Sequence, residues 1–184
     1  MQLSSNDDLG QLVKCMNFAA IKHKSQRRKD LSQTPYINHP IGVANLLVEG
    51  GITDLVTLQA ALLHDTVEDT NTTFEEISAE FGEEVCSVVR EVTDDKSLPY
   101  QRRKELQILN ASNSSHRAKL VKLADKLYNL RDLQKSPPVG WTSDRINQYF
   151  NWSYKVVSQL QGTNAYLEEN LNNIFIKKKI KRSA

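Results

Sequence analysis

A chain of 184 residues, with 39% hydrophobic and 25% charged side chains, is long enough to bury the core of one globular domain. No run of roughly eighteen apolar residues is present and the N-terminus lacks an apolar signal segment, so we expect a cytoplasmic protein with neither a transmembrane helix nor a secretory leader. The formal net charge is +2, but five cations between residues 177 and 182 leave the rest of the chain at −3, which argues against a nucleic-acid or membrane-surface binder.

We expect one domain over residues 1–176, followed by a basic tail over residues 177–184 that is solvated and disordered. Cys15 and Cys86 lie far apart and match no metal or redox spacing. Both are therefore expected to be free thiols in a reducing compartment.

The first predicted helix runs from Ser5 to about Lys24, with apolar residues at spacings of three and four. His23 continues its inner face and is expected to be a core or surface histidine rather than a ligand. A polar loop follows with three consecutive cations, Arg27-Arg28-Lys29. They are either solvated or in contact with a phosphate, since the loop leads directly to a second histidine.

That second histidine, His39, is followed by Pro40, which suits the first turn of a helix. An apolar face over residues 41–48 then ends at Gly50-Gly51, so His39 is expected at a helix N-terminus. Asp54 is expected to cap the next helix, whose apolar stripe runs without a turn signal into a polar hexad.

The hexad, His64-Asp65-Thr66-Val67-Glu68-Asp69, carries the clearest signal for chemistry. An adjacent His-Asp followed by two further carboxylates is a poor choice for packing and a good one for binding a metal. The hexad is expected on or at the end of a helix, where His64 would stack over Glu68 and Asp65 over Asp69. It therefore predicts a metal site with its own acid/base pair.

The pattern after the hexad stays helical. Thr73 with Glu76 predicts a capping box, and residues 85–92 are rich in valine but have helical spacing. Pro99 is expected to open a polar helix that runs to about Asn110, after a loop over residues 94–97.

The second strong signal is Asp125, which is embedded among the leucines and alanines of a predicted helix over residues 118–133. Aspartate is seldom buried unless it is paired or bound to a metal. Asp125 is therefore either a metal ligand or the partner of Lys122 or Lys126 in a salt bridge. Asn129 lies one helical turn further on, beside it.

Two more helices are expected towards the C-terminus, the first capped by Thr142 and the second beginning after Gly162-Thr163. The whole chain then contains eight or nine helices and no confident strand. The predicted fold class is all-α.

The conspicuous histidines and aspartates, His39, His64, Asp65 and Asp125, give a divalent cation four ligands whose formal charge cancels its own. Nitrogen and oxygen ligands together suit Mn²⁺, Fe²⁺ or Zn²⁺ better than Ca²⁺ or Mg²⁺. Because no cysteine is among them, an open site with water is favoured over a closed structural zinc site. Glu68 and Asp69 are then free to orient the nucleophile and handle its proton.

The order His39, His64-Asp65, Asp125 resembles the H…HD…D signature of the HD phosphohydrolase superfamily, which is all-helical and binds divalent metals. Four stretches more narrowly resemble the hydrolase domain of RelA/SpoT enzymes, which remove the 3′-diphosphate from (p)ppGpp with Mn²⁺: residues 28–29, 36–40, 64–69 and 123–130. The resemblance covers nearly all of residues 8–176. It leaves no room for the synthetase and regulatory domains of the long bacterial enzymes, so the chain is similar to the stand-alone metazoan SpoT homologues.

This resemblance implies that His39, His64, Asp65 and Asp125 are the metal ligands and that Glu68 and Asp69 are the catalytic pair. It also implies that seven further residues contact the substrate: the basic pair Arg28 and Lys29, the ribose contact Asn129, and the pocket residues Tyr36, Trp141, Arg145 and Tyr149. Trp141 and Tyr149 also suit a core. Tyr100 stands where animal relatives carry a lysine, so a phosphate contact is expected to be lost there.

The activity implied is Mn²⁺-dependent hydrolysis of (p)ppGpp to GDP or GTP and pyrophosphate. Removal of the 2′-phosphate of NADPH is a variant that the animal members also imply. A nucleotide 5′-phosphatase of the same superfamily and an HD module that binds nucleotides without turnover are the other readings. Each of them has a small-molecule nucleotide as its partner, and the sequence leaves the oligomeric state open.

Overall fold

The computed structural model describes residues 8–180, which form ten helices. These are α1 (Asp8–Lys22), α2 (Asn38–Glu49), α3 (Leu55–Leu63), α4 (Thr66–Asp69), α5 (Phe74–Phe81), α6 (Glu83–Val92), α7 (Tyr100–Ala111), α8 (His116–Lys135), α9 (Ser143–Ser158) and α10 (Ala165–Lys177). Within the described range, β pairing is limited to an isolated bridge between Arg27 and Pro35. The predicted all-α class is confirmed, and the helix beyond the expected eight or nine is the single turn α4.

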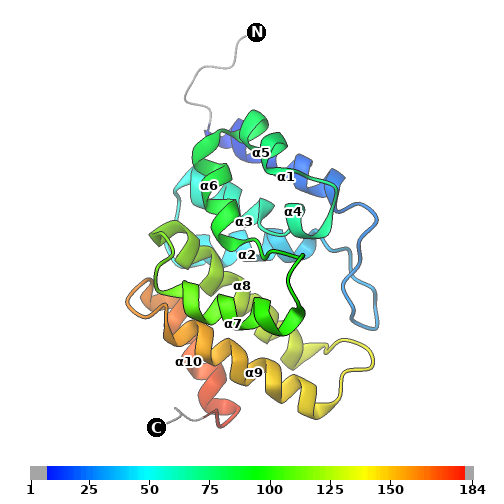
Figure 1. Ribbon diagram of the computed structural model, residues 1–184, viewed down its shortest axis with the longest axis vertical. Coiled ribbons are helices and arrows are strands. Elements are labelled where there is room, and N and C mark those ends of the chain that lie inside the picture. Colours follow the sequence, from blue (N-terminus) through cyan, green and yellow to red (C-terminus); the bar gives the residue numbers. More distant parts are fainter. Residues whose placement is uncertain (1–7, 181–184) are drawn as a thin grey trace.

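Helix α8 lies at the centre of the fold and packs against α2, α3, α6, α9 and α10. Figure 1 shows α1, α5 and α6 at one end of the molecule and α9 and α10 at the other, with α8 between them. Its buried residues include consecutive pairs such as Leu120-Val121 and Lys126-Leu127, which point in different directions around the helix axis. A helix that buries several of its sides needs neighbours on several sides, and this explains the central position of α8.

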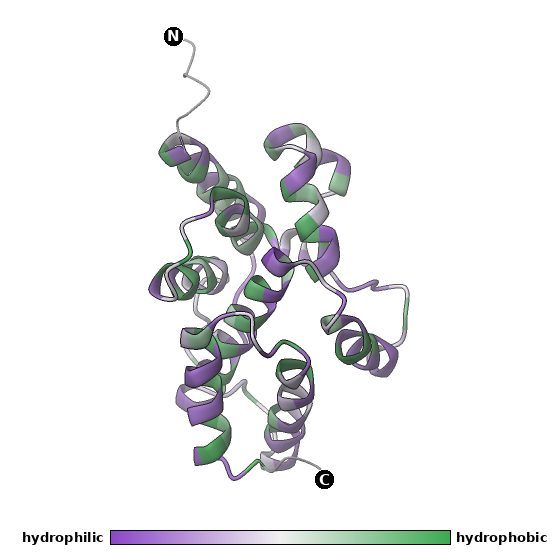
Figure 2. Cartoon of the chain, turned by 90° about the vertical axis from the view of Figure 1, so that its left-hand side faces the viewer, coloured by the Kyte–Doolittle hydropathy of each residue, from purple (hydrophilic) through white to green (hydrophobic). Residues whose placement is uncertain are grey.

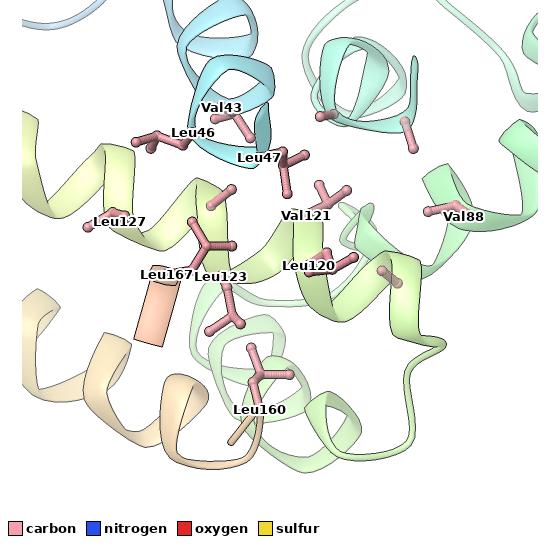
Figure 3. Packing of buried hydrophobic residues seen from close by; sticks show 14 of the residues in the cluster. Val43, Leu46, Leu47, Val88, Leu120, Val121, Leu123, Leu127, Leu160 and Leu167 are labelled. Atoms are coloured by element: carbon pink, nitrogen blue, oxygen red, sulfur yellow. The ribbon is translucent and has the colours of Figure 1, made fainter. Parts of the chain in front are cut away.

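The core is one cluster of leucines, valines and alanines that joins α2, α3, α6 and α8 to α9 and α10. Figure 3 shows Val43, Leu46 and Leu47 of α2 packed near the aliphatic side chains of α8, with Leu160 and Leu167 on the other side of α8. Figure 2 shows that individual helices carry both apolar and polar residues, as expected for helices that turn one side to this core. The core holds α2 and α8 together, and these helices carry His39 and Asp125, the two candidate ligands that lie furthest apart in the sequence.

Three helix starts follow the predicted capping. Asp54, Thr73 and Thr142 accept hydrogen bonds from the backbone N–H groups of Thr57, Glu76 and Arg145. The capping box at Thr73 is only half formed, because the Glu76 carboxylate forms an ion pair with Lys22 (2.7 Å).

The two ends of the chain differ in detail from expectation. Residues 5–7 of the first predicted helix lie outside the described residues, and α1 ends at Lys22, two residues early. Lys177, expected in the tail, is the last residue of α10, and the Ile180 N–H donates to the Phe175 carbonyl (3.0 Å) while its side chain packs on the core. Residues 181–184 of the predicted tail lie outside the described residues.

Between residues 8 and 180, no helix has both the length and the apolar character needed to cross a membrane. The cytoplasmic location stays a prediction.

Candidate metal centre and nucleotide site

The hexad lies at the end of a helix, as expected, but it is not one continuous helix. α3 ends at Leu63, Asp65 departs from regular helical geometry (φ −100°, ψ −4°), and α4 then adds a single turn. The Thr66 hydroxyl donates to the Leu63 carbonyl (2.7 Å) across this break. Regular four-residue stacking holds for Asp65 and Asp69, whose backbones share a hydrogen bond (2.9 Å).

Four side chains from α2, the α3–α4 junction and α8 converge on one point. The Nε2 atoms of His39 and His64 are 3.2 Å apart, and Asp125 Oδ1 lies 3.2 Å from the first and 3.7 Å from the second. Asp65 Oδ2 lies 3.1 Å from His64 Nε2 and 3.4 Å from His39 Nε2. The structure therefore brings all four predicted ligands together.

This arrangement fits a divalent cation. Metal-to-ligand distances of about 2.0–2.2 Å place neighbouring ligand atoms roughly 3.0–3.6 Å apart, and all of these separations except the 3.7 Å between His64 and Asp125 fall in that range. The carbonyl of Ala61 can only accept a hydrogen bond, so the Nδ1 of His64, 2.7 Å away, carries the ring proton of the neutral imidazole. The Nε2 lone pair of His64 is then free to bind a metal, and it faces the same centre as the Nε2 of His39.

Without a cation, the charges of the cluster stabilise one another. Burial acts to lower the pKa of His64, but the carboxylates of Asp65 and Asp125 raise it well above its usual value. Burial likewise acts to raise the pKa of Asp65, yet the two histidines hold it well below the usual value. The lowered pKa of Asp65 keeps this carboxylate in the ionised form that binds a metal.

Asp125 satisfies both readings of the sequence at once. Its Oδ1 faces the histidines and accepts a hydrogen bond from the Asn129 side chain (2.6 Å), while its Oδ2 accepts one from the Lys126 ammonium (2.6 Å). Tyr36 acts similarly on the other aspartate, because its hydroxyl donates to Asp65 Oδ2 (2.6 Å). These neighbours orient the carboxylates towards the centre.

The two acids of α4 have different surroundings. Glu68 is in long contact with Arg103 (3.4 Å) and with the backbone N–H of Asp94 (3.4 Å). Burial, followed by the charge of Asp65, raises the pKa of Glu68 to about 7. Asp69 is held by shorter bonds to both oxygens, from Gln26 and from Lys96; these two distances are 2.9 Å and 3.0 Å.

The cluster lies between two cavities. One, of about 440 Å³, is lined by His64, Asp65, Glu68 and Asp125 together with residues of α6 and α7. The other, of about 320 Å³, is lined by Asp69 and by six of the seven predicted substrate contacts: Arg28, Lys29, Tyr36, Asn129, Trp141 and Tyr149. Glu68 and Asp69 therefore face different cavities, because successive residues of a helical turn point about 100° apart.

The second cavity combines charge with aromatic surface. Arg28 donates to Asn129 Oδ1 and to Asp132 (2.9 Å each) and lies over the Tyr36 ring, 5.6 Å from its centroid. The Val139 N–H donates to the Lys29 carbonyl (2.8 Å), which ties the loop before α9 to the basic loop before α2. The cavity thus offers an aromatic surface and cations of the kind that bind a nucleotide.

Three predicted contacts lie at the edge of this region. Arg145 is exposed and sits over the Trp141 ring, 4.3 Å from its centroid, while Tyr149 contacts the same ring at 5.9 Å. Trp141 and Tyr149 are half-buried against the core and also line the cavity, so the core and pocket readings both hold. Arg145 instead lines a third cavity, of about 600 Å³, between α7 and α9.

Sequence reasoning missed several residues that act on the site. Gln26 and Lys96 contact Asp69 across more than twenty residues of chain, and Arg103 contacts Glu68 across thirty-five. No local pattern marks these contacts, since each depends on how a loop or α7 folds back over α4.

Comparison with known proteins gives consistent matches. A model of the HD domain matches residues 15–148, which include every candidate site residue except Tyr149. The chain is 59% identical over 172 residues to the guanosine-3′,5′-bis(diphosphate) 3′-pyrophosphohydrolase of Xenopus tropicalis, covering 93% of this chain and 96% of that protein. It is also 59% identical over 169 residues to the Homo sapiens protein of the same name, covering 91% and 94%.

A solved structure described as a metazoan orthologue of SpoT that hydrolyses ppGpp and plays a role in starvation responses superposes with a TM-score of 0.91. The two chains share 54% sequence identity, and the match covers 98% of this chain and 99% of that one.

Proposed function

This chain belongs to the HD-domain family, and from that membership we propose that it is a metal-dependent hydrolase that removes the 3′-diphosphate from (p)ppGpp, giving GDP or GTP and pyrophosphate. The observation that carries the proposal is the convergence of two imidazoles and two carboxylates beside a cavity with a basic and aromatic lining. The names of the similar animal proteins support the choice of substrate.

His39, His64, Asp65 and Asp125 would hold the cation, and we propose Mn²⁺ because imidazole and carboxylate ligands together suit it, with Fe²⁺ and Zn²⁺ as the other candidates. A divalent cation supplies Lewis-acid activation of the phosphoryl group and lowers the pKa of water. In the reaction, water adds to the phosphorus next to the ribose, the bond from that phosphorus to the 3′-oxygen breaks, and the 3′-oxygen takes up a proton.

Glu68 and Asp69 divide the remaining work in this proposal. Glu68 has a pKa near 7 and only long contacts, so it is suited to exchange a proton at neutral pH. Asp69 is fixed through both oxygens by Gln26 and Lys96, so it is suited to hold a water or a substrate group in position. Arg28, Lys29, Tyr36, Asn129, Trp141, Arg145 and Tyr149 would bind the nucleotide.

A substrate panel tests the proposal. The purified protein, loaded with Mn²⁺ and checked by metal analysis, is incubated with ppGpp, NADPH and deoxynucleoside monophosphates at equal concentrations, and kcat/KM is compared. We expect the highest value for ppGpp, with GDP and pyrophosphate as products. A higher value for NADPH would reassign the substrate, and inactivity on all three would refute a hydrolase.

A matched variant tests the residues. Replacing Glu68 and Asp69 together by alanine should abolish turnover while metal binding remains, because neither residue is among the four ligands. Glu105→Gln changes an exposed carboxylate that pairs with Arg102 and should leave kcat unchanged. Turnover that survives the double change would remove Glu68 and Asp69 from the mechanism.

A further inference from the structure

Lys104, on α7, carries its ammonium inside a group of aromatic rings. Its Nζ lies 3.5 Å from the centroid of the Trp152 ring, 5.5 Å from that of Tyr100 and 5.6 Å from that of Tyr149. The position is fixed from the backbone as well, because the Trp152 Nε1–H donates to the Lys104 carbonyl (3.0 Å). Two helices, α7 and α9, thus hold one cation between them.

No carboxylate among residues 8–180 forms an ion pair or hydrogen bond with the Lys104 ammonium, although its side chain is half-buried. Two other lysines near the site form ion pairs: Lys126 with Asp125, and Lys96 with Asp69. Removing a cation from water without an anionic partner is unfavourable, and contact with ring faces offsets only part of that cost. The Lys104 ammonium is therefore a half-buried cation that is available to an anionic ligand.

The open side of this group is a cavity. Lys104 lines the cavity of about 600 Å³ between α7 and α9, together with Arg145, Trp141 and Tyr149. The two last residues also line the cavity next to the metal centre. The Trp152 ring also links Lys104 to the surroundings of the metal centre, since the ammonium of Lys126, the neighbour of Asp125, is 5.0 Å from the centroid of the Trp152 ring.

We propose that Lys104 is a phosphoryl-binding residue, and that the Lys104–Arg145 cavity holds the phosphate group of the substrate that lies away from the metal. A phosphoryl group there would give Lys104 an anionic partner and would be clamped between an ammonium and a guanidinium. The inference rests on the proposed function for the identity of the nucleotide. Tyr100, one turn before Lys104 on α7, contributes a ring against the Lys104 ammonium.

The charge state of Lys104 gives a specific signature. Burial, followed by the charge of Lys126, lowers the pKa of Lys104 to about 8. The ammonium of the free protein is therefore present at pH 7 and largely lost at pH 9. The charged and titratable groups around it come from α4, α7, α8, α9 and the loop after α6: Glu68, Tyr100, Asp125, Lys126, Asp144, Arg145, Tyr149 and Asp94.

Two candidate groups share the phosphoryl chemistry: the 5′-diphosphate and the outer phosphate of the 3′-diphosphate. Steady-state kinetics on ppGpp and on guanosine 3′-diphosphate, which lacks the 5′ groups, separate them. Lys104→Gln should raise KM about tenfold or more with a smaller change in kcat. If only ppGpp is affected, Lys104 holds the 5′-diphosphate; if both are, it holds the outer 3′ phosphate.

Lys104→Arg keeps a cation at every pH used. The wild-type KM should rise roughly tenfold between pH 7 and pH 9, while the KM of Lys104→Arg should stay nearly constant over that range, because the substrate phosphates are already ionised at pH 7. A residue that only packs between rings would not give this difference. Lys155→Gln, at an exposed position of α9, is the control and should match the wild type.

Calorimetric binding of ppGpp to the Mn²⁺-loaded protein with Glu68 and Asp69 replaced by alanine reads the same contact without turnover. A wild type that does not hydrolyse ppGpp would refute the proposed function, and this binding measurement would still test Lys104. An unchanged KM for both substrates and unchanged ppGpp affinity in Lys104→Gln would overturn the inference.

Discussion

Gly42 of α2 gives a prediction that links helix packing to the metal centre. A Cβ atom at this position would lie 2.7 Å from Cδ2 and 2.9 Å from Cζ of Tyr128, and closer still to Cε2. Ordinary contacts between carbon atoms are about 3.5–4.0 Å. Gly42→Ala must therefore displace the Tyr128 ring or separate α2 from α8, and these helices carry the ligands His39 and Asp125.

The magnitude follows from two opposing terms. Overpacking costs about 1–3 kcal/mol, and alanine gains about 1 kcal/mol over glycine within a helix. We expect a net loss near 1 kcal/mol, or a fall in Tm of about 2–4 °C. The Tyr128 ring also packs on His39, with centroids 5.0 Å apart, so we expect affinity for Mn²⁺ to fall by roughly tenfold.

The assay is thermal unfolding of the metal-free protein together with titration of Mn²⁺, each repeated in a Tyr128→Ala background. Removing the ring makes room for the new methyl group, so Gly42→Ala should there be neutral or stabilising by up to about 1 kcal/mol. An equal loss of stability in both backgrounds would refute contact with Tyr128 as the cause.

Chelation of the metal should lower Tm by about 5–10 °C, because a cation at a hundred times its Kd stabilises the folded chain by about 2.7 kcal/mol. Calorimetry with and without EDTA would detect the change, and an unchanged Tm would contradict a bound cation. Gln26→Met removes the donor to Asp69 at nearly constant length and should lower kcat roughly tenfold. It should also lower Tm, because Gln26 Oε1 bonds the buried His23 ring (2.7 Å), and a normal kcat would exclude an orienting role for Gln26. Asp54→Ala removes the cap of α3 and the ion pair with Arg117 and should lower the free energy of unfolding by about 1–2 kcal/mol, whereas Asp54→Asn, which keeps a capping acceptor, should lose less. Burial acts to raise the pKa of Asp54, but hydrogen bonds from Arg117 and Thr57 hold it below its usual value. Chemical denaturation should therefore show the stabilisation by Asp54 above about pH 4 and its loss as the pH falls further. A stability difference between wild type and Asp54→Ala that is independent of pH would contradict the ion pair.

Elements with a local cause could be predicted from the sequence. The helix periodicity, the caps at Asp54 and Thr142, and the end of α2 at Gly50 depend on residues within one or two turns of each other. The sequence left open whether the helix ends before the hexad or continues through it, because the apolar stripe of α3 runs into the hexad without glycine or proline. The break after Leu63 lies where the Thr66 hydroxyl donates a hydrogen bond to the Leu63 carbonyl. Whether this side chain or a backbone N–H group bonds that carbonyl is not decided by residue types alone.

The ligands of the candidate site could be predicted from the sequence, but the contacts made to the site from other elements could not. These ligands could be proposed because two histidines and two aspartates are conspicuous in apolar surroundings. The structure groups His39, His64 and Asp125, and Asp65 lies within 3.4 Å of both imidazoles. The contacts that control Glu68, Asp69 and Lys104 were not predictable, because Arg103, Lys96 and Trp152 reach them from other elements.

Asp125 shows why the sequence alone left two readings open. A carboxylate has two oxygens and can serve two partners, so a salt bridge with Lys126 does not exclude a metal ligand. On α8, Lys126 is the next residue and bonds Oδ2, while Asn129 lies one turn away and bonds Oδ1. The lysine holds Oδ2 and leaves Oδ1 directed at His39. The ion pair that competed with the metal reading is thus the contact that orients Asp125 for it.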